Sequence, residues 1–129
     1  MATSDNIDEK RLAEEARASE HGEAYRAMEK IDEYRIGIGA RVNGGLVYFV
    51  EVVVPVTSGP RVELGEMERS LDVLKRLDEE GFTLTPQEDG SISGELLVPE
   101  DELERGYERV VSILKSLSDT VSLPGNSAY

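Results

Sequence analysis

Glu51 is the residue of this sequence best placed to do chemistry, because its carboxylate lies inside the apolar run LVYFVEVVVPVT at 46–57. Burial among apolar side chains perturbs the proton affinity of a carboxylate, which can then serve as a general acid or base. Such catalysis normally needs a second polar group, and the sequence offers no obvious partner. We therefore favour a structural interpretation, in which Glu51 pairs with an arginine or reaches solvent.

The other candidate groups also have structural explanations. His21 is the only histidine and the chain has no cysteine, so thiolate sites and cysteine nucleophiles are excluded. The acidic run at 100–104 lacks the spacing of a calcium loop and suits the positive end of a helix dipole. The glycines at 37 and 39 lie inside a strand-like segment and lack the third glycine of a dinucleotide fingerprint. We expect no catalytic residue, no metal site and no cofactor.

The composition describes one acidic domain, residues 1–129, with a formal charge of −13 from 27 acidic and 14 basic residues. Nucleic acid and anionic membranes are disfavoured as partners, because both attract a basic stripe and none is present. No signal peptide is recognisable, and the apolar run is shorter than the ~20 residues that span a bilayer. We expect a soluble cytoplasmic protein, for which a basic or amphipathic protein segment is a permitted partner.

Residues 5–34 have the pattern of a helix with two unlike halves. The first half has only a thin apolar stripe among charged residues. The second half has a better apolar face, made by Ala24, Ala27, Met28 and Ile31. At the join, the pair His21–Gly22 indicates either a break or a first half that stands apart from the body. In the second case residues 1–20 form a projecting or mobile helix, or a segment that packs on another subunit. We leave these alternatives open.

A hairpin is predicted next, from the sequence NGG at 43–45 between the strand-like segments 35–42 and 46–57. The even-numbered residues of both segments are apolar, and residues opposed across a hairpin share a face. A three-residue loop joins these two apolar faces, whereas a two-residue loop would set them on opposite sides. We therefore predict the three-residue loop, with Gly45 in the left-handed conformation.

The next element is a helix at about 65–80, preceded by an optional short strand at 61–64. Its predicted apolar face consists of Leu64, Met67, Leu71, Leu74 and Leu77. Gly81 followed by Phe82 predicts the helix end, with Phe82 in contact with Leu77.

The last third of the chain predicts a second hairpin and a final helix. The strands are 82–86 and 91–98, joined by a three-residue loop that ends in Gly90. Pro99 is expected to open the helix in its first turn, where a missing N–H costs nothing. The apolar stripe of this helix is Leu103, Tyr107, Val110, Leu114, Leu117 and Val121. Residues 122–129 are expected to form a loose tail.

The predicted fold is α+β, with an antiparallel sheet of four strands in two hairpins, a fifth strand left open, and helices mainly on one face. The odd-numbered face of the central strand needs a cover that three helices on the other face do not supply. We therefore propose an interaction surface consisting of Val47, Phe49, Glu51 and Val53. On this face Phe49 lies opposite Gly39, which its ring can cover.

The element order resembles that of the class I chaperones of type III secretion, over most of the chain and without a shared motif. This resemblance implies a small, acidic, dimeric protein that binds segments of client proteins without catalysis. The order is also similar to that of the roadblock family, dimeric scaffolds for small GTPases. That family usually has three strands before the last helix, where this chain shows two.

The sequence favours a non-enzymatic interaction module, chaperone-like or a regulatory adaptor, that acts as a homodimer. Two alternatives stay open. One is a small-molecule-binding or enzymatic domain with Glu51 in a pocket between sheet and helices. The other is a subunit of a larger complex that docks through residues 5–20.

Overall fold

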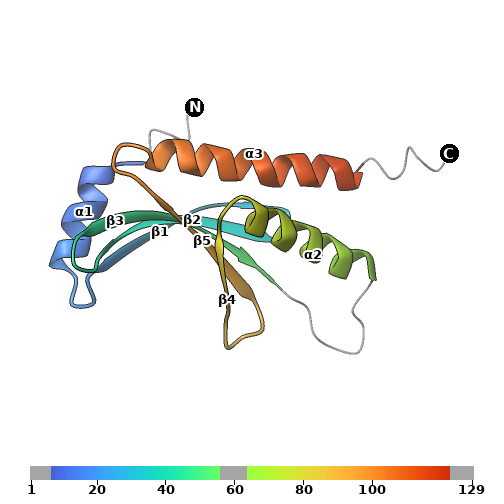
Figure 1. Cartoon of the computed structure of the whole chain (residues 1–129), viewed down its shortest axis with the longest axis horizontal. Helices are drawn as coiled ribbons and strands as arrows, with labels where there is room; N and C mark the ends of the chain where they lie inside the picture. The colour runs from blue at the N-terminus through green and yellow to red at the C-terminus, as the bar shows by residue number, and fades with distance from the viewer. Residues whose placement is uncertain (1–6, 56–63, 123–129) are drawn as a thin grey trace.

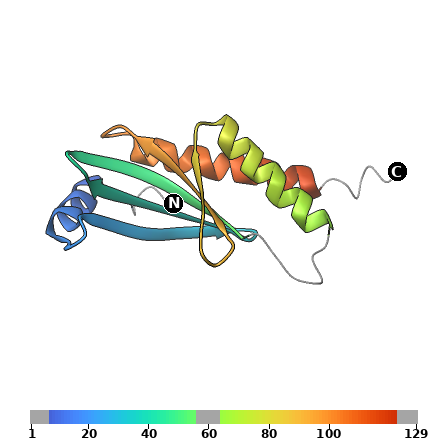
Figure 2. The ribbon, with the colours of Figure 1, turned by 60° about the horizontal axis from the view of Figure 1, so that its bottom comes forward.

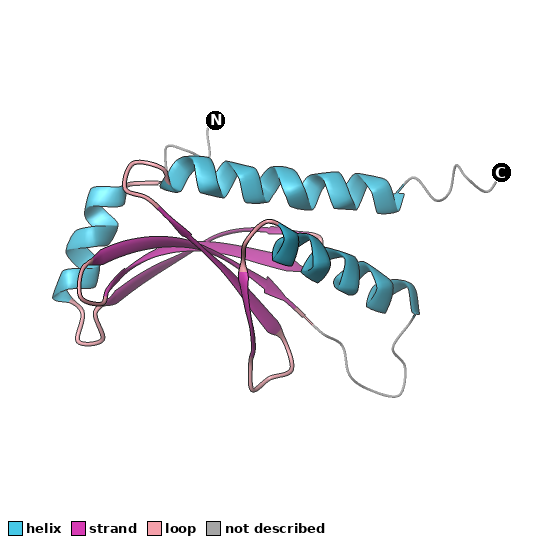
Figure 3. Ribbon diagram, viewed as in Figure 1, coloured by secondary structure: helices cyan, strands magenta, loops and turns pink. Residues whose placement is uncertain are grey.

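The computed structural model describes residues 7–55 and 64–122 and has a five-stranded antiparallel sheet with three helices on one side (Figures 1 and 3). The predicted fold class is confirmed. The elements are α1 (Glu9–Ala18), β1 (Glu23–Ile31), β2 (Tyr34–Val42), β3 (Leu46–Val54), α2 (Leu64–Glu79), β4 (Thr83–Pro86), β5 (Ile92–Val98) and α3 (Leu103–Ser122).

The strands lie in the order β1-β2-β3-β5-β4, so β3 is the central strand, as its apolar faces predicted. The register of β2 and β3 pairs Val42 with Leu46 and Gly39 with Phe49, which confirms the three-residue loop. The left-handed residue of this loop is Gly44, with φ +74°, and the prediction of Gly45 was wrong. The parity argument selects the three-residue loop over the two-residue loop, but it does not decide which of two adjacent glycines takes the positive φ.

The second half of the predicted helix 5–34 is strand β1, so that part of the prediction was wrong. Ala24 pairs with Ala40 and faces the helices, and the register of β1 then shifts at a bulge between Ala27 and Glu29. Beyond the bulge Ile31, an odd-numbered residue, faces the helices instead. Because of the extra residue, the apolar side chains of β1 that face the helices do not recur every two residues. They recur at spacings of three and four, which is the pattern of a helix.

Helix α1 begins after Asp8, whose side chain accepts a hydrogen bond from the backbone N–H of Arg11 at 3.2 Å. Its thin apolar stripe, Leu12, Ala13 and Ala16, is buried against β1 and β2. Of the two alternatives at His21–Gly22, the structure shows the break, because these residues lie in the turn between α1 and β1.

Helix α2 ends as predicted, with Gly81 at φ +97° and the N–H of Phe82 bonded to the carbonyl of Leu77 at 2.9 Å. Among residues 70–79 of this helix, Val73 and Leu77 are buried. The side chains of the predicted Leu64 and Met67 lie outside the described residues. The prediction was wrong for Leu71, which is 58% exposed. Residues 61–63 of the optional strand lie outside the described residues, and Leu64 belongs to α2.

The second hairpin has the predicted register, in which Leu84 lies opposite Gly94. Helix α3, however, begins at Leu103 rather than at Pro99, because a turn closed by the N–H of Glu102 on the carbonyl of Pro99 precedes it. In this turn Asp101 has φ +72°. The members of its apolar stripe from Leu103 to Leu114 are all buried against the sheet.

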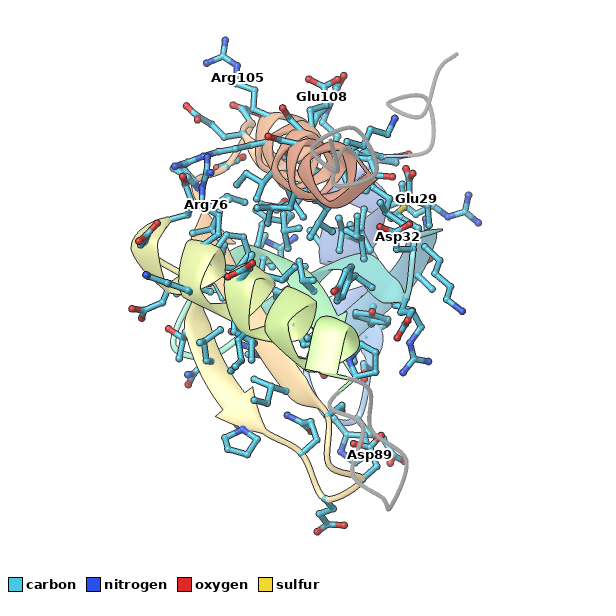
Figure 4. The ribbon with its side chains drawn as sticks, turned by 90° about the vertical axis from the view of Figure 1, so that its right-hand side faces the viewer. Glu29, Asp32, Arg76, Asp89, Arg105 and Glu108 are labelled. Atoms are coloured by element: carbon cyan, nitrogen blue, oxygen red, sulfur yellow. The ribbon has the colours of Figure 1, made fainter. Side chains whose placement is uncertain are left out.

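Polar contacts join the helices to one another and to the sheet, and Figure 4 labels two of the residues that make them, Arg76 and Glu29. Glu80, just beyond the end of α2, accepts from Arg76 at 3.0 Å and also from Arg109 of α3. These two arginines lower the pKa of Glu80. The hydroxyl of Tyr107 donates to Glu29 of β1, and burial followed by this bond raises the pKa of Tyr107. Arg105 and Glu108 extend outward from α3 in Figure 4.

The side chain of Glu9, the first residue of α1, caps the start of α3. Its two carboxylate oxygens accept hydrogen bonds from the backbone N–H groups of Asp101 at 2.8 Å and Leu103 at 2.9 Å. The free N–H groups of a helix start and the positive end of its dipole both favour a carboxylate there. An element near the N-terminus therefore completes a helix more than 90 residues later in the chain.

Replacing Glu9 by alanine is expected to lower the free energy of unfolding by about 1–2 kcal/mol, the usual cost of a lost helix cap. Chemical denaturation followed by circular dichroism measures this change. Glu14→Ala is the control, because Glu14 is an exposed residue on the same helix. Equal effects of the two substitutions would contradict the capping role.

Candidate interaction surface

The sheet has a second face, opposite the helices, which we call the open face. In Figure 2 none of the helices α1, α2 and α3 lies over the middle of β1, β2 and β3 on this side. By register, the open face consists of Glu23, Tyr25, Ala27 and Lys30 of β1, Arg35, Gly37, Gly39 and Arg41 of β2, Val47, Phe49, Glu51 and Val53 of β3, Ser93, Glu95 and Leu97 of β5, and Thr83 and Thr85 of β4.

Phe49 lies at the middle of the open face and is only 2% exposed, because neighbouring side chains cover it. Its ring occupies the space over Gly39, as predicted. The guanidinium of Arg41 lies above the ring, 4.6 Å from its centroid. Phe49 is thus buried without belonging to the core cluster between sheet and helices.

Arg41 reaches from one side of Phe49 to the other through ion pairs. Its guanidinium donates to both carboxylate oxygens of Glu95, at 3.1 and 2.7 Å, and through Nε to Glu23 at 3.0 Å. The two-pronged bond to Glu95 is the largest cause that raises the pKa of Arg41. One arginine of β2 therefore pairs with Glu23 of the adjacent strand β1 and, across β3, with Glu95 of β5.

Glu51 has neutral partners instead of the arginine that the sequence suggested. It accepts a hydrogen bond from the hydroxyl of Ser93 at 2.8 Å and one from the hydroxyl of Tyr25. The ring of Tyr25 lies over Gly37, which is the residue opposite Glu51. Burial, followed by the nearby charge of Glu51, raises the pKa of Tyr25 to about 12.

A groove of about 520 Å³ adjoins Glu51 at the end of the open face that lies beside the β4–β5 loop. Arg35, Glu51, Asp89 and Ser93 are among its lining residues. The carboxylate of Asp89 accepts from the N–H and the hydroxyl of Ser91, which lowers the pKa of Asp89. Glu51 therefore lies on the side of the sheet away from the helices, and the proposed location between sheet and helices was wrong.

The open face presents apolar side chains to solvent around its buried centre. Leu97, directly opposite Phe49 in the register of β3 and β5, is 58% exposed, and Tyr25 is 46% exposed. Val47 and Val53 are half-buried. Exposed apolar groups gathered on one sheet face are typical of a surface that binds another protein.

The four surface residues named from the sequence all lie on the open face, and Arg41 shares this face as the loop register predicted. Their neighbours Leu97, Tyr25 and Glu95 were missed. The pairing of β3 with β5 would have revealed Leu97, and the sequence gives no local signal of which strands of two hairpins meet. Tyr25 was missed because its segment was interpreted as a helix.

The remaining candidates stay separate from the open face. His21 is exposed in the turn before β1, and the acidic run at 100–104 lies at the start of α3. Within residues 7–55 and 64–122, no group of three or more potential ligands is arranged to hold a metal ion. None of the helices described there is long and apolar enough to cross a membrane.

Comparison of the chain with family models, with curated proteins and with solved structures finds no match.

Proposed function

We propose that this chain is a non-enzymatic protein-interaction module, chaperone-like or a regulatory adaptor, that acts as a homodimer. The observation that supports this most strongly is the open face, where exposed Leu97 and Tyr25 and half-buried valines surround a buried aromatic ring. Aromatic residues and arginine are enriched in the centres of protein interfaces, and this face has both.

The polar groups of the open face favour binding over catalysis. Arg41 is engaged by two carboxylates, and Glu51 by two hydroxyl groups. Neither charged group lacks a partner, so another protein can cover both without burying an unpaired charge. Such pairing holds the side chains in place before binding, so that less conformational entropy is lost when a partner binds.

Light scattering on the purified chain tests the homodimer. We expect a mass of twice 14.2 kDa at 1 M KCl over a range of protein concentrations. At 0.1 M KCl we expect a weaker dimer, since two chains of charge −13 repel and the screening length grows from ~3 to ~10 Å. A mass of 14.2 kDa in both salts would overturn the proposal.

A further inference from the structure

The open face is electrically neutral, although the chain is strongly acidic. Its charged members are the acids Glu23, Glu51 and Glu95 and the bases Lys30, Arg35 and Arg41. Three charges of each sign cancel, so the 24 acids and 11 bases elsewhere carry the whole charge of −13. A strongly basic partner is attracted to those other surfaces, whereas a second copy of this chain meets no net repulsion on the open face.

Charged groups of this face already have hydrogen-bonding partners, which lowers the cost of burying them in an interface. Removing a lone charge from water is costly, and a pair that is already hydrogen-bonded loses much less. Arg41 already holds Glu23 and Glu95, and Glu51 already accepts from Ser93. A second copy can therefore cover the middle of the face without leaving any of these four charges unpartnered.

The size of the face suits a stable dimer. Strands β1, β2 and β3 have nine residues and are about 30 Å long, whereas β5 has seven residues and β4 has four. With about 4.8 Å between strands, the sheet covers roughly 600 Å². This is the lower end of the roughly 600–1,000 Å² that each partner buries in a standard interface. Twisted antiparallel sheets pack face to face at about 10 Å separation, with their strands within about 30° of each other.

We infer that a second copy of this chain packs on the open face with its own open face, so that helices lie outside and two sheets lie inside a four-layer dimer. This inference rests on the homodimer proposed above and adds the surface that forms it. Leu97 is the exposed apolar side chain beside the central Phe49. In a two-fold interface a residue near the axis meets its own equivalent, which places the two Leu97 side chains close together.

Single cysteines test this arrangement, because the chain has none of its own. Leu97→Cys places one thiol on the open face, and Leu71→Cys places one on α2 at the same exposure of 58%. Under mild oxidation, or with a short bismaleimide, we expect the first variant to give a covalent dimer on a non-reducing gel. The second variant should stay a single chain.

Glutamate variants at the same two positions provide a second readout by light scattering. Leu97→Glu is expected to weaken dimerisation by about 100-fold, because the two-fold axis brings two unpaired charges into the interface. Leu71→Glu should leave the dimer intact. We expect all variants to fold, because both positions are exposed, and circular dichroism verifies this.

The outcomes separate the two proposals. A wild-type dimer that cross-links through Leu71→Cys and not through Leu97→Cys would overturn the open-face arrangement and leave the proposed function standing. A monomeric wild type, with no cross-link through position 97, would overturn both.

Discussion

Replacing Gly39 by alanine is expected to lower the free energy of unfolding by about 3 kcal/mol, the upper range for an overpacked site. A methyl group at this position would lie 2.5 Å from the backbone carbonyl oxygen of Ala24 and 2.9 Å from Cε2 of Phe49. The carbonyl is part of the ladder between β1 and β2, so it cannot move without weakening strand pairing. Urea denaturation measures the change.

Gly45→Ala is the matched control for this experiment. A methyl group there meets nothing within 4 Å, and Gly45 does not have a positive φ. The expected change is below about 1 kcal/mol and towards greater stability, because alanine restricts the unfolded chain more than glycine does. Similar losses for both variants would show that the Phe49 ring does not lie on Gly39.

Replacing Leu12 by alanine is also expected to cost about 3 kcal/mol, since it deletes most of a fully buried side chain and leaves a cavity. Leu12 lies on α1, the helix that the sequence left open as a projecting or docking segment. Its burial against β1 and β2 makes α1 part of the folded body. Thermal and urea unfolding should both detect the loss.

The control here is the same substitution at an exposed leucine. Leu71→Ala removes equal volume from a side chain that is 58% exposed, so its expected cost is below about 0.5 kcal/mol. If Leu12→Ala cost no more than Leu71→Ala and instead weakened association, α1 would be a docking segment after all. The two variants therefore distinguish a structural helix from a binding helix.

The hairpins were predictable because side-chain parity in strands is strict. Of a two-residue and a three-residue loop, only the three-residue loop places the apolar residues of β2 and β3 on the same face, and the register of Val42 with Leu46 follows from it. The second hairpin follows the same argument, as the pairing of Leu84 with Gly94 confirms. The end of α2 was predictable for a local reason too, since Gly81 and Phe82 form a helix stop by themselves.

Strand β1 was not predictable in the same way. It contains alanine, methionine, lysine and glutamate, which are good helix formers, and its bulge reproduces helical spacing. Pairing with β2 overrides these local preferences, and that pairing is a long-range property of the fold. The start of α3 at Leu103, rather than at the predicted Pro99, also depends on a long-range contact. The side chain that caps this start belongs to Glu9.

The bulge in β1 also bears on how many copies can assemble. A sheet can grow sideways by adding strands to its free edges, and such growth has no natural limit. Here one edge is β1, where the bulge between Ala27 and Glu29 interrupts the regular row of hydrogen-bonding groups. The other edge, β4, has only four residues and ends at Pro86. Both edges therefore discourage fibres, so the face-to-face association that we propose stops at a dimer.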